Sequence, residues 1–114
     1  MAPVRYQLTI HAQKLSRGWF RKPNPYAEVT ITGGPREGTN LGRTEVLEKA
    51  ANPEWVKTLF FDTESSEYLP LKIVVYDDRG IGYDDVLIAE ASFEATEVHR
   101  NAGHADSAKY GWAT

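Results

Sequence analysis

Apolar and polar side chains alternate with a period of two along several segments of the chain. In residues 4–12 every even position is apolar or aromatic and every odd position is polar, which is typical of a β-strand with one buried face. Residues 71–76 form the most apolar segment and are expected to be a central strand. Seven strands are predicted, at residues 4–12, 27–32, 41–47, 56–61, 71–76, 86–93 and 108–112.

Turn-forming residues separate these strands. Gly33-Gly34-Pro35, Asn52-Pro53 and the Asp- and Gly-rich segment 77–85 are examples, and such clusters favour turns over continued strands. Helical periodicity is limited to a single predicted turn near residues 94–99. Many short strands divided by turns predict an all-β protein, an antiparallel sandwich or barrel.

The antiparallel order predicts which loops lie together. If consecutive strands run in opposite directions, the connections at residues 13–25, 48–55 and 77–85 leave the same end of the sandwich. The Gly-rich connection at residues 33–40 leaves the opposite end.

The first of these connections has an unusual composition. Trp19 and Phe20 lie side by side among the cations Lys14, Arg17, Arg21 and Lys22, with no acidic residue between them. Exposed adjacent aromatics invite association, and aromatic rings next to cations suit the headgroup layer of an anionic membrane. The alternative is that Trp19 folds back over its own loop as a lid.

The third connection is rich in carboxylates. Asp77 and Asp78 precede a short Gly-containing turn, and Asp84 and Asp85 follow it. Crowded carboxylates are favourable around Ca²⁺, which takes about six to eight oxygen ligands. Ordinary turn chemistry explains the same residues without a metal, because Asp and Gly favour turns. The loop alone does not decide between these interpretations.

The amino-acid composition restricts the classes of function that this chain could have. The 114 residues predict one domain, 1–114, without cysteine and without an apolar run long enough to cross a bilayer. The absence of cysteine suits a cytoplasmic location. The net charge of −3 combines a basic first part (residues 1–49, eight Lys/Arg against four Glu) with an acidic remainder. A net acidic chain binds nucleic acid poorly, so a nucleic-acid partner is excluded.

Catalytic signatures are not found in the sequence. His11, His99 and His104 lack metal-ligand spacing, no serine lies in a nucleophile elbow, and no cysteine nucleophile exists. Trp55 and Trp112 are interpreted as residues that close the edge of a core. We therefore expect a protein that is not an enzyme.

Several motifs resemble those of the C2 domain family over almost the whole chain. Asn-Pro-Glu-Trp at residues 52–55, Val-Tyr-Asp at 75–77 and Pro-Asn-Pro-Tyr at 23–26 carry the resemblance. The last of these replaces an Asp-Pro-Tyr or Asp-Pro-Phe element of the family. Residues 42–55 look closest to copine C2 domains, whereas the Trp-Phe-Arg-Lys-Pro loop looks more like C2 domains of ubiquitin ligases. The resemblance implies a Greek-key β-sandwich of seven to eight strands with Ca²⁺- and membrane-binding loops at one end.

The resemblance also implies a ligand set, and this chain departs from it. Two of the family's five carboxylates are retained, as Asp77 and Asp85. The other matching positions hold Gly18, Asn24 and Arg79. Asp78 and Asp84 could compensate only in a remodelled loop. A cation at position 79 repels Ca²⁺, or it takes the place of the metal and pairs with Asp77 and Asp85. No cofactor is then required, and any Ca²⁺ binding is expected to have low affinity.

The function expected from the sequence is Ca²⁺-independent docking on an anionic phospholipid membrane as a cytoplasmic, peripheral module. The predicted contact residues are Arg17, Trp19, Phe20, Arg21 and Lys22, assisted by Ile81 and Tyr83. The weak or vestigial metal site would comprise Asn24, Asp77, Asp78, Asp84 and Asp85. The alternatives are a protein-interaction module that binds a partner domain, and a weak Ca²⁺-dependent phospholipid-binding domain.

Overall fold

The computed structural model describes residues 3–16, 21–64 and 68–95. These residues form six β-strands: β1 (Pro3–Leu8), β2 (Pro25–Ile31), β3 (Asn40–Arg43), β4 (Leu59–Glu64), β5 (Pro70–Asp77) and β6 (Val86–Glu94). The seventh predicted strand, at 108–112, lies outside the described residues, as do residues 96–99 of the predicted helical turn. An all-β fold is confirmed.

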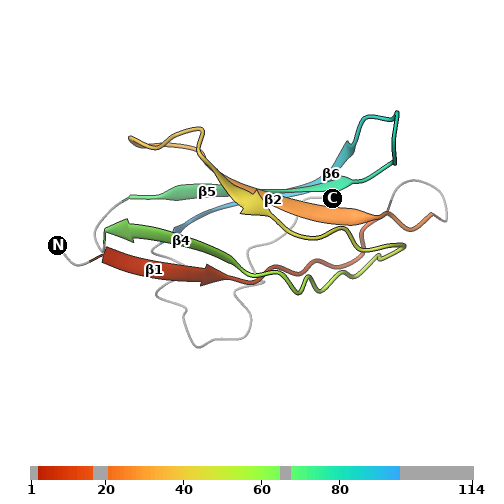
Figure 1. Cartoon of the computed structure of the whole chain (residues 1–114), viewed down its shortest axis with the longest axis horizontal. Helices are drawn as coiled ribbons and strands as arrows, with labels where there is room; N and C mark the ends of the chain where they lie inside the picture. The colour runs from red at the N-terminus through yellow and green to blue at the C-terminus, as the bar shows by residue number, and fades with distance from the viewer. Residues whose placement is uncertain (1–2, 17–20, 65–67, 96–114) are drawn as a thin grey trace.

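Two antiparallel sheets face each other (Figure 1). One contains β1 and β4, and the other has the strand order β3-β2-β5-β6. Strands β2 and β5 pair in register from Pro25 opposite Asp77 to Ile31 opposite Leu71. This pairing forms the centre of the larger sheet, as the apolar content of residues 71–76 predicts.

The core lies between the two sheets. Buried side chains of several strands point into it: Tyr6 of β1, Val29 of β2 and Val75 of β5 are buried, whereas Arg5 and Gln7 of β1 are exposed. The alternation read from the sequence is therefore confirmed in β1 and β2. Trp55 is also buried, and its indole Nε1 donates a hydrogen bond to the carbonyl oxygen of Pro25 (3.1 Å). Its assignment to the core is confirmed, whereas Trp112 lies outside the described residues.

Several predicted strand boundaries are wrong. β2 begins at Pro25 rather than at position 27, and β4 ends at Glu64 rather than at position 61. β1 ends at Leu8 rather than at position 12, although an isolated bridge between His11 and Glu54 continues the pairing. β3 ends at Arg43 rather than at position 47. β4 begins at Leu59 rather than at position 56.

One side chain explains the last two differences. The carboxylate of Glu45 accepts hydrogen bonds from the backbone N–H groups of Val56 (2.7 Å) and Lys57 (3.1 Å). These two N–H groups are thus bound by a side chain instead of a neighbouring strand. The connection from residue 44 to 58 runs as an irregular segment between the two sheets' edges.

Candidate functional site at the loop end

Three connections meet at one end of the sandwich, as predicted from the antiparallel order. Asn24 precedes β2, and its backbone carbonyl accepts a hydrogen bond from the N–H of Asp78, just after β5 (2.9 Å). The second connection joins them because the N–H of Lys49 donates to Oδ1 of Asn24 (2.9 Å). The turn at residues 33–38 lies at the opposite end (Figure 1).

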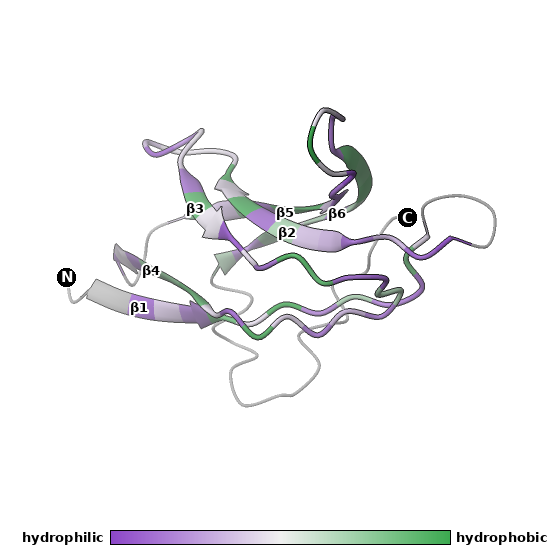
Figure 2. Cartoon of the chain, turned by 45° about the vertical axis from the view of Figure 1, so that its right-hand side comes forward, coloured by the Kyte–Doolittle hydropathy of each residue, from purple (hydrophilic) through white to green (hydrophobic). Residues whose placement is uncertain are grey.

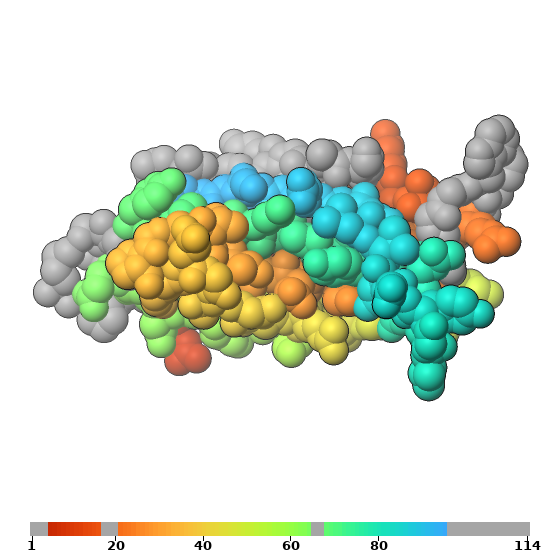
Figure 3. Space-filling model, turned by 90° about the horizontal axis from the view of Figure 1, so that it is seen from above, coloured from red at the N-terminus to blue at the C-terminus, as the bar shows by residue number. Residues whose placement is uncertain are grey.

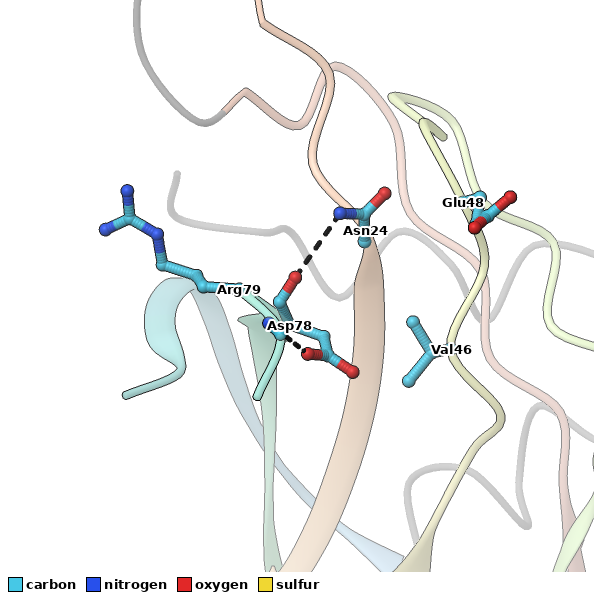
Figure 4. Close-up of a pocket in the computed structure, with 6 residues that line it drawn as sticks. Asn24, Val46, Glu48, Asp78 and Arg79 are labelled. Atoms are coloured by element: carbon cyan, nitrogen blue, oxygen red, sulfur yellow. Dashed lines mark hydrogen bonds between the residues drawn. The ribbon is translucent and has the colours of Figure 1, made fainter. Parts of the chain in front are cut away.

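A shallow pocket of about 280 Å³ lies where the three connections meet. Its lining residues are Asn24, Val46, Glu48, Asp78, Arg79 and Gly80. In Figure 4 the Asn24 amide points to the backbone carbonyl of Asp78, at 3.3 Å, and the Asp78 carboxylate points toward Val46. Asn24 thus joins all three connections through its backbone and both polar atoms of its side chain.

Asp77, the first retained carboxylate, is turned into the protein. Only 2% of its surface is exposed, and its Oδ1 accepts a hydrogen bond from the backbone N–H of Asn24 (2.9 Å). A buried carboxylate requires such a donor, because burial without a hydrogen bond is costly. Asp77 therefore holds the start of β2 against the end of β5.

Asp85, the second retained carboxylate, is bound from two sides. The phenolic hydroxyl of Tyr26 donates to its Oδ2 (2.5 Å), and the backbone N–H of Arg79 donates to its Oδ1 (3.4 Å). Burial, the hydrogen bond to Asp85 and the Asp85 charge raise the pKa of Tyr26 to about 12, although the nearby Arg43 cation opposes the shift. The Arg43 guanidinium lies over the Tyr26 ring, with its carbon 5.2 Å from the ring centroid.

The remaining charged residues of this loop face in different directions. Oδ1 of Asp78 accepts a hydrogen bond from the N–H of Gly80 (2.8 Å), which closes a local turn. Asp84 is exposed. The Arg79 guanidinium points away from Asn24 and Asp78 (Figure 4). The expectation that Arg79 takes the place of the metal and pairs with Asp77 and Asp85 is wrong, because it is the Arg79 backbone N–H that contacts Asp85.

The resemblance implies Asp77 and Asp85 as Ca²⁺ ligands, and both carboxylates are bound by protein groups in this structure. Within residues 3–16, 21–64 and 68–95, no three His, Asp or Glu side chains are grouped closely enough to hold a metal ion. The Asp77 and Asp85 carboxylates are engaged by the N–H of Asn24 and the hydroxyl of Tyr26. Whether Ca²⁺ binds weakly in solution stays a prediction.

The predicted membrane-contact residues are only partly described. Arg21 and Lys22 are exposed and lead into β2. Ile81 is fully exposed and Tyr83 is 73% exposed at the tip of the loop that joins β5 and β6. Figure 3, a view from above, shows this loop, in teal, standing out from the body of the molecule. Arg17, Trp19 and Phe20 lie outside the described residues, so neither their membrane contact nor the lid alternative is tested.

Sequence reasoning missed several residues at this end. Tyr26 was interpreted only as part of a motif, although its position beside the acid-rich loop in the predicted sheet could have indicated a contact with Asp85. Val46, Val86 and Leu87 were expected within half-buried strands, but all three are substantially exposed. Val46 lies in the irregular connection after β3 and lines the pocket.

The architecture is a two-sheet antiparallel β-sandwich in which three connections form a polar site at one end. The sequence profile of the C2 domain family matches residues 7–110. This chain belongs to the C2 domain family. Assignment to the copine or ubiquitin-ligase type stays a prediction.

Solved structures share the fold. The chain is similar to human GIVD cytosolic phospholipase A2 in complex with methyl gamma-linolenyl fluorophosphonate, with a TM-score of 0.67 and 18% identity over 83% of this chain. It spans only 13% of that enzyme's chain. The RIM C2A domain from Drosophila matches 96% of this chain and 84% of its own, with a TM-score of 0.64 and 18% identity. A further C2 domain matches 81% of this chain and 75% of its own, with a TM-score of 0.62 and 22% identity.

In the part of the chain that the structure describes, no helix has the length and apolar character needed to cross a membrane.

Proposed function

We propose that this C2 domain is a non-enzymatic, peripheral membrane-binding module that docks on anionic phospholipid through its loop end at the cytoplasmic side of a membrane. The observation that carries the proposal is the exposure of Ile81 and Tyr83 at the end of the sandwich where Arg21 and Lys22 are also exposed. Membership of the C2 family supports it, because such domains are typically non-catalytic modules that bind membranes.

The expected free-energy contributions of these side chains are consistent with reversible membrane binding. Insertion of an exposed aliphatic or aromatic side chain contributes about 1.5 to 3 kcal/mol when burial is complete. A Lys or Arg near an anionic surface contributes about 1 kcal/mol. Ile81 and Tyr83 together with Arg21 and Lys22 therefore supply several kcal/mol, enough for docking without permanent anchoring.

Acidic residues at this end repel an anionic surface, and the positions of their carboxylates reduce this repulsion. Asp77 is buried, and Asp85 accepts hydrogen bonds from Tyr26 and Arg79. Asp84 and Asp85 are both exposed, but the Asp85 charge is partly offset by these two donors. Because the Asp77 and Asp85 carboxylates are bound by protein groups, we propose that docking is largely independent of Ca²⁺.

Liposome sedimentation tests the proposal. The protein should sediment with vesicles of phosphatidylcholine and phosphatidylserine equally well in Ca²⁺ and in chelator, and less with phosphatidylcholine alone. The double variant Ile81→Ala, Tyr83→Ala should bind less, whereas Phe60→Ala, an exposed apolar residue on the outer face of β4, should bind as the wild type does. Binding that requires Ca²⁺ would favour the Ca²⁺-dependent alternative. No binding to any vesicle would favour a protein-interaction module.

A further inference from the structure

Two consecutive apolar residues at the start of β6 are exposed. Val86 has 40% and Leu87 has 50% of its surface exposed to solvent, although both lie in a strand that the sequence predicts to be half buried. Further along the strand the alternation is regular, with Ala89, Ala91 and Phe93 buried. Figure 2 shows the beginning of β6 as a strongly hydrophobic ribbon next to the loop that joins it to β5.

The pairing of β6 with β5 explains why both side chains reach solvent. Val86 lies opposite Asp77, and Leu87 lies opposite Tyr76. Directly opposed residues share a face of a sheet, so Val86 lies on the face of the buried Asp77 and Leu87 on the outer face. A register irregularity between Val75 and Tyr76 separates this pair from the regular part of the ladder. The first two residues of β6 thus expose apolar surface on both sides of the strand.

This surface continues the loop tip. Ile81, Tyr83, Val86 and Leu87 are all exposed within seven positions, and β6 is an edge strand of the described four-stranded sheet. Along the strand the apolar surface ends at Glu90, which forms an ion pair with Lys72 (3.1 Å). We define these four exposed residues as the β6 ridge.

The shape and charge of the β6 ridge identify its partner. Ile81 is fully exposed, so the ridge is convex at its tip. A rigid protein partner would need a matching groove that covers both sides of the strand, whereas the interfacial layer of a bilayer deforms around a convex apolar edge. Exposed cations at Arg21, Lys22 and Arg79 lie at the same end, which suits the headgroups of an anionic bilayer.

We propose that the β6 ridge enters the membrane interface as one surface, so that the domain docks tilted with the start of β6 against the bilayer rather than on its loop tips alone. This inference rests on the proposed function and adds an orientation to it. Asp84, which lies between Tyr83 and Val86 in the chain and is exposed, then lies at headgroup level, where its carboxylate remains hydrated. Asp85 is exposed as well, but its carboxylate accepts a hydrogen bond from Tyr26, and it also stays at headgroup level.

Site-specific labels test this orientation directly, because the chain has no cysteine that would compete for a label. Single variants Ile81→Cys, Leu87→Cys and Phe60→Cys carry an environment-sensitive fluorophore and are mixed with vesicles of phosphatidylcholine and phosphatidylserine. The labels at positions 81 and 87 should both shift to the blue and be protected from an aqueous quencher. The label at position 60, on the outer face of β4, should not change.

The outcomes separate this inference from the proposed function. If the protein sediments with vesicles and only the label at position 81 responds, docking is end-on and the tilted orientation is overturned, whereas the proposed function stands. If the protein ignores vesicles, both fall. A second measurement uses unlabelled protein. Leu87→Ser should weaken vesicle binding about fivefold, because the exposed half of the leucine side chain no longer enters the membrane interface. The matched variant Phe60→Ser should leave binding unchanged, and equal affinities for wild type and Leu87→Ser would overturn the inference.

Discussion

The phenolic hydroxyl of Tyr26 donates a hydrogen bond to the carboxylate of Asp85, 59 positions later in the chain. Tyr26 lies in β2 and Asp85 immediately before β6, with β5 between the two strands. The bond therefore crosses the central strand and fixes the base of the exposed loop to the larger sheet. Asp85, one of two acids that match the family's Ca²⁺ ligands, acts here as an acceptor for protein groups.

Removal of this hydroxyl should loosen the loop. Tyr26→Phe retains the ring, which stacks on Tyr76 with 5.5 Å between ring centroids, but removes one of the two donors to the Asp85 carboxylate, the phenolic hydroxyl. We expect a loss of about 1 to 2 kcal/mol in the free energy of unfolding. Hydrogen exchange at the Arg79 amide should accelerate, because that N–H also binds Asp85. Tyr68→Phe, at an exposed tyrosine, is the control; equal stability of the two variants would contradict the prediction.

The same contact predicts the behaviour of the domain at high pH. The pKa of Tyr26 is about 12 in the folded protein against an ordinary value of 10.0. Because the raised pKa favours the neutral hydroxyl in the folded state, its contribution to stability is complete below pH 10 and is lost as the pH rises from 10 to 12. Denaturant titrations should show that wild type loses more stability over this interval than Tyr26→Phe does. Parallel curves for the two proteins would show that Tyr26 is not responsible.

The sequence predicts the fold at this end better than it predicts the site. Alternation in residues 27–32 predicts β2, and the apolar content of residues 71–76 predicts β5 as a central strand. Both predictions succeed because one face of each strand is buried along its length. Antiparallel order then places the three connections together without knowledge of any contact. The pattern is insufficient where side chains replace a strand partner, as Glu45 does for Val56 and Lys57.

The orientation of individual acids could not be predicted for a related reason. Composition shows four Asp residues in the third connection, but their directions depend on donors from distant segments. Asp77 turns inward because the backbone N–H of Asn24 faces it, and Asp85 turns toward Tyr26. A period-two pattern carries no information about such contacts between connections.

The orientations of Asp77 and Asp85 lead to a prediction about the affinity for Ca²⁺. We expect the wild-type domain to bind Ca²⁺ no more tightly than about 10⁻⁴ to 10⁻³ M, measured by calorimetry. Asn24→Asp restores a carboxylate at a position that matches the family's ligand, but it removes the amide that donates to the carbonyl of Asp78. The variant should be about 1 kcal/mol less stable without metal and should gain more thermal stability from Ca²⁺ than wild type does.

Two comparisons make the metal prediction specific. Arg79→Ala should leave the metal-free stability unchanged, because its guanidinium is exposed and points away from Asn24 and Asp78. A micromolar dissociation constant for Ca²⁺ in the wild type would show that Asp77 and Asp85 reorient toward the metal. These two carboxylates would then be Ca²⁺ ligands, contrary to the prediction.

Glu45 should contribute to stability in a pH-dependent manner. Partial burial raises the pKa of its carboxyl, but hydrogen bonds from the N–H groups of Val56, Glu45 itself and Lys57, together with the Lys57 charge, outweigh burial and lower the pKa below its usual 4.5. The contribution is therefore present above about pH 4.5 and is lost as the pH falls through the lowered pKa. Glu45→Gln should cost about 0.5 to 1.5 kcal/mol at pH 7.

Denaturant titration over a range of pH checks this prediction. The difference between wild type and Glu45→Gln should shrink toward zero in acid, because the wild-type carboxyl is then protonated too. Glu48→Gln provides a matched control on the same connection, where the side chain is exposed. A difference for Glu45→Gln that does not change with pH would assign its effect to packing rather than to charge.

Separate variants should distinguish apolar insertion from electrostatic attraction at the loop end. Charge reversal, Arg21→Glu with Lys22→Glu, should weaken binding to vesicles of phosphatidylcholine and phosphatidylserine, and added salt should weaken wild-type binding in the same way, because screening acts over about 8 Å at physiological ionic strength. Both residues are exposed, so circular dichroism and thermal melting should be unchanged.

Trp19→Ala with Phe20→Ala should reduce binding while the remaining affinity keeps the wild-type salt dependence, since the cations are retained. If the double alanine variant unfolds instead, Trp19 or Phe20 belongs to the folded body as a lid, and the contribution of these aromatics to membrane binding is disproved.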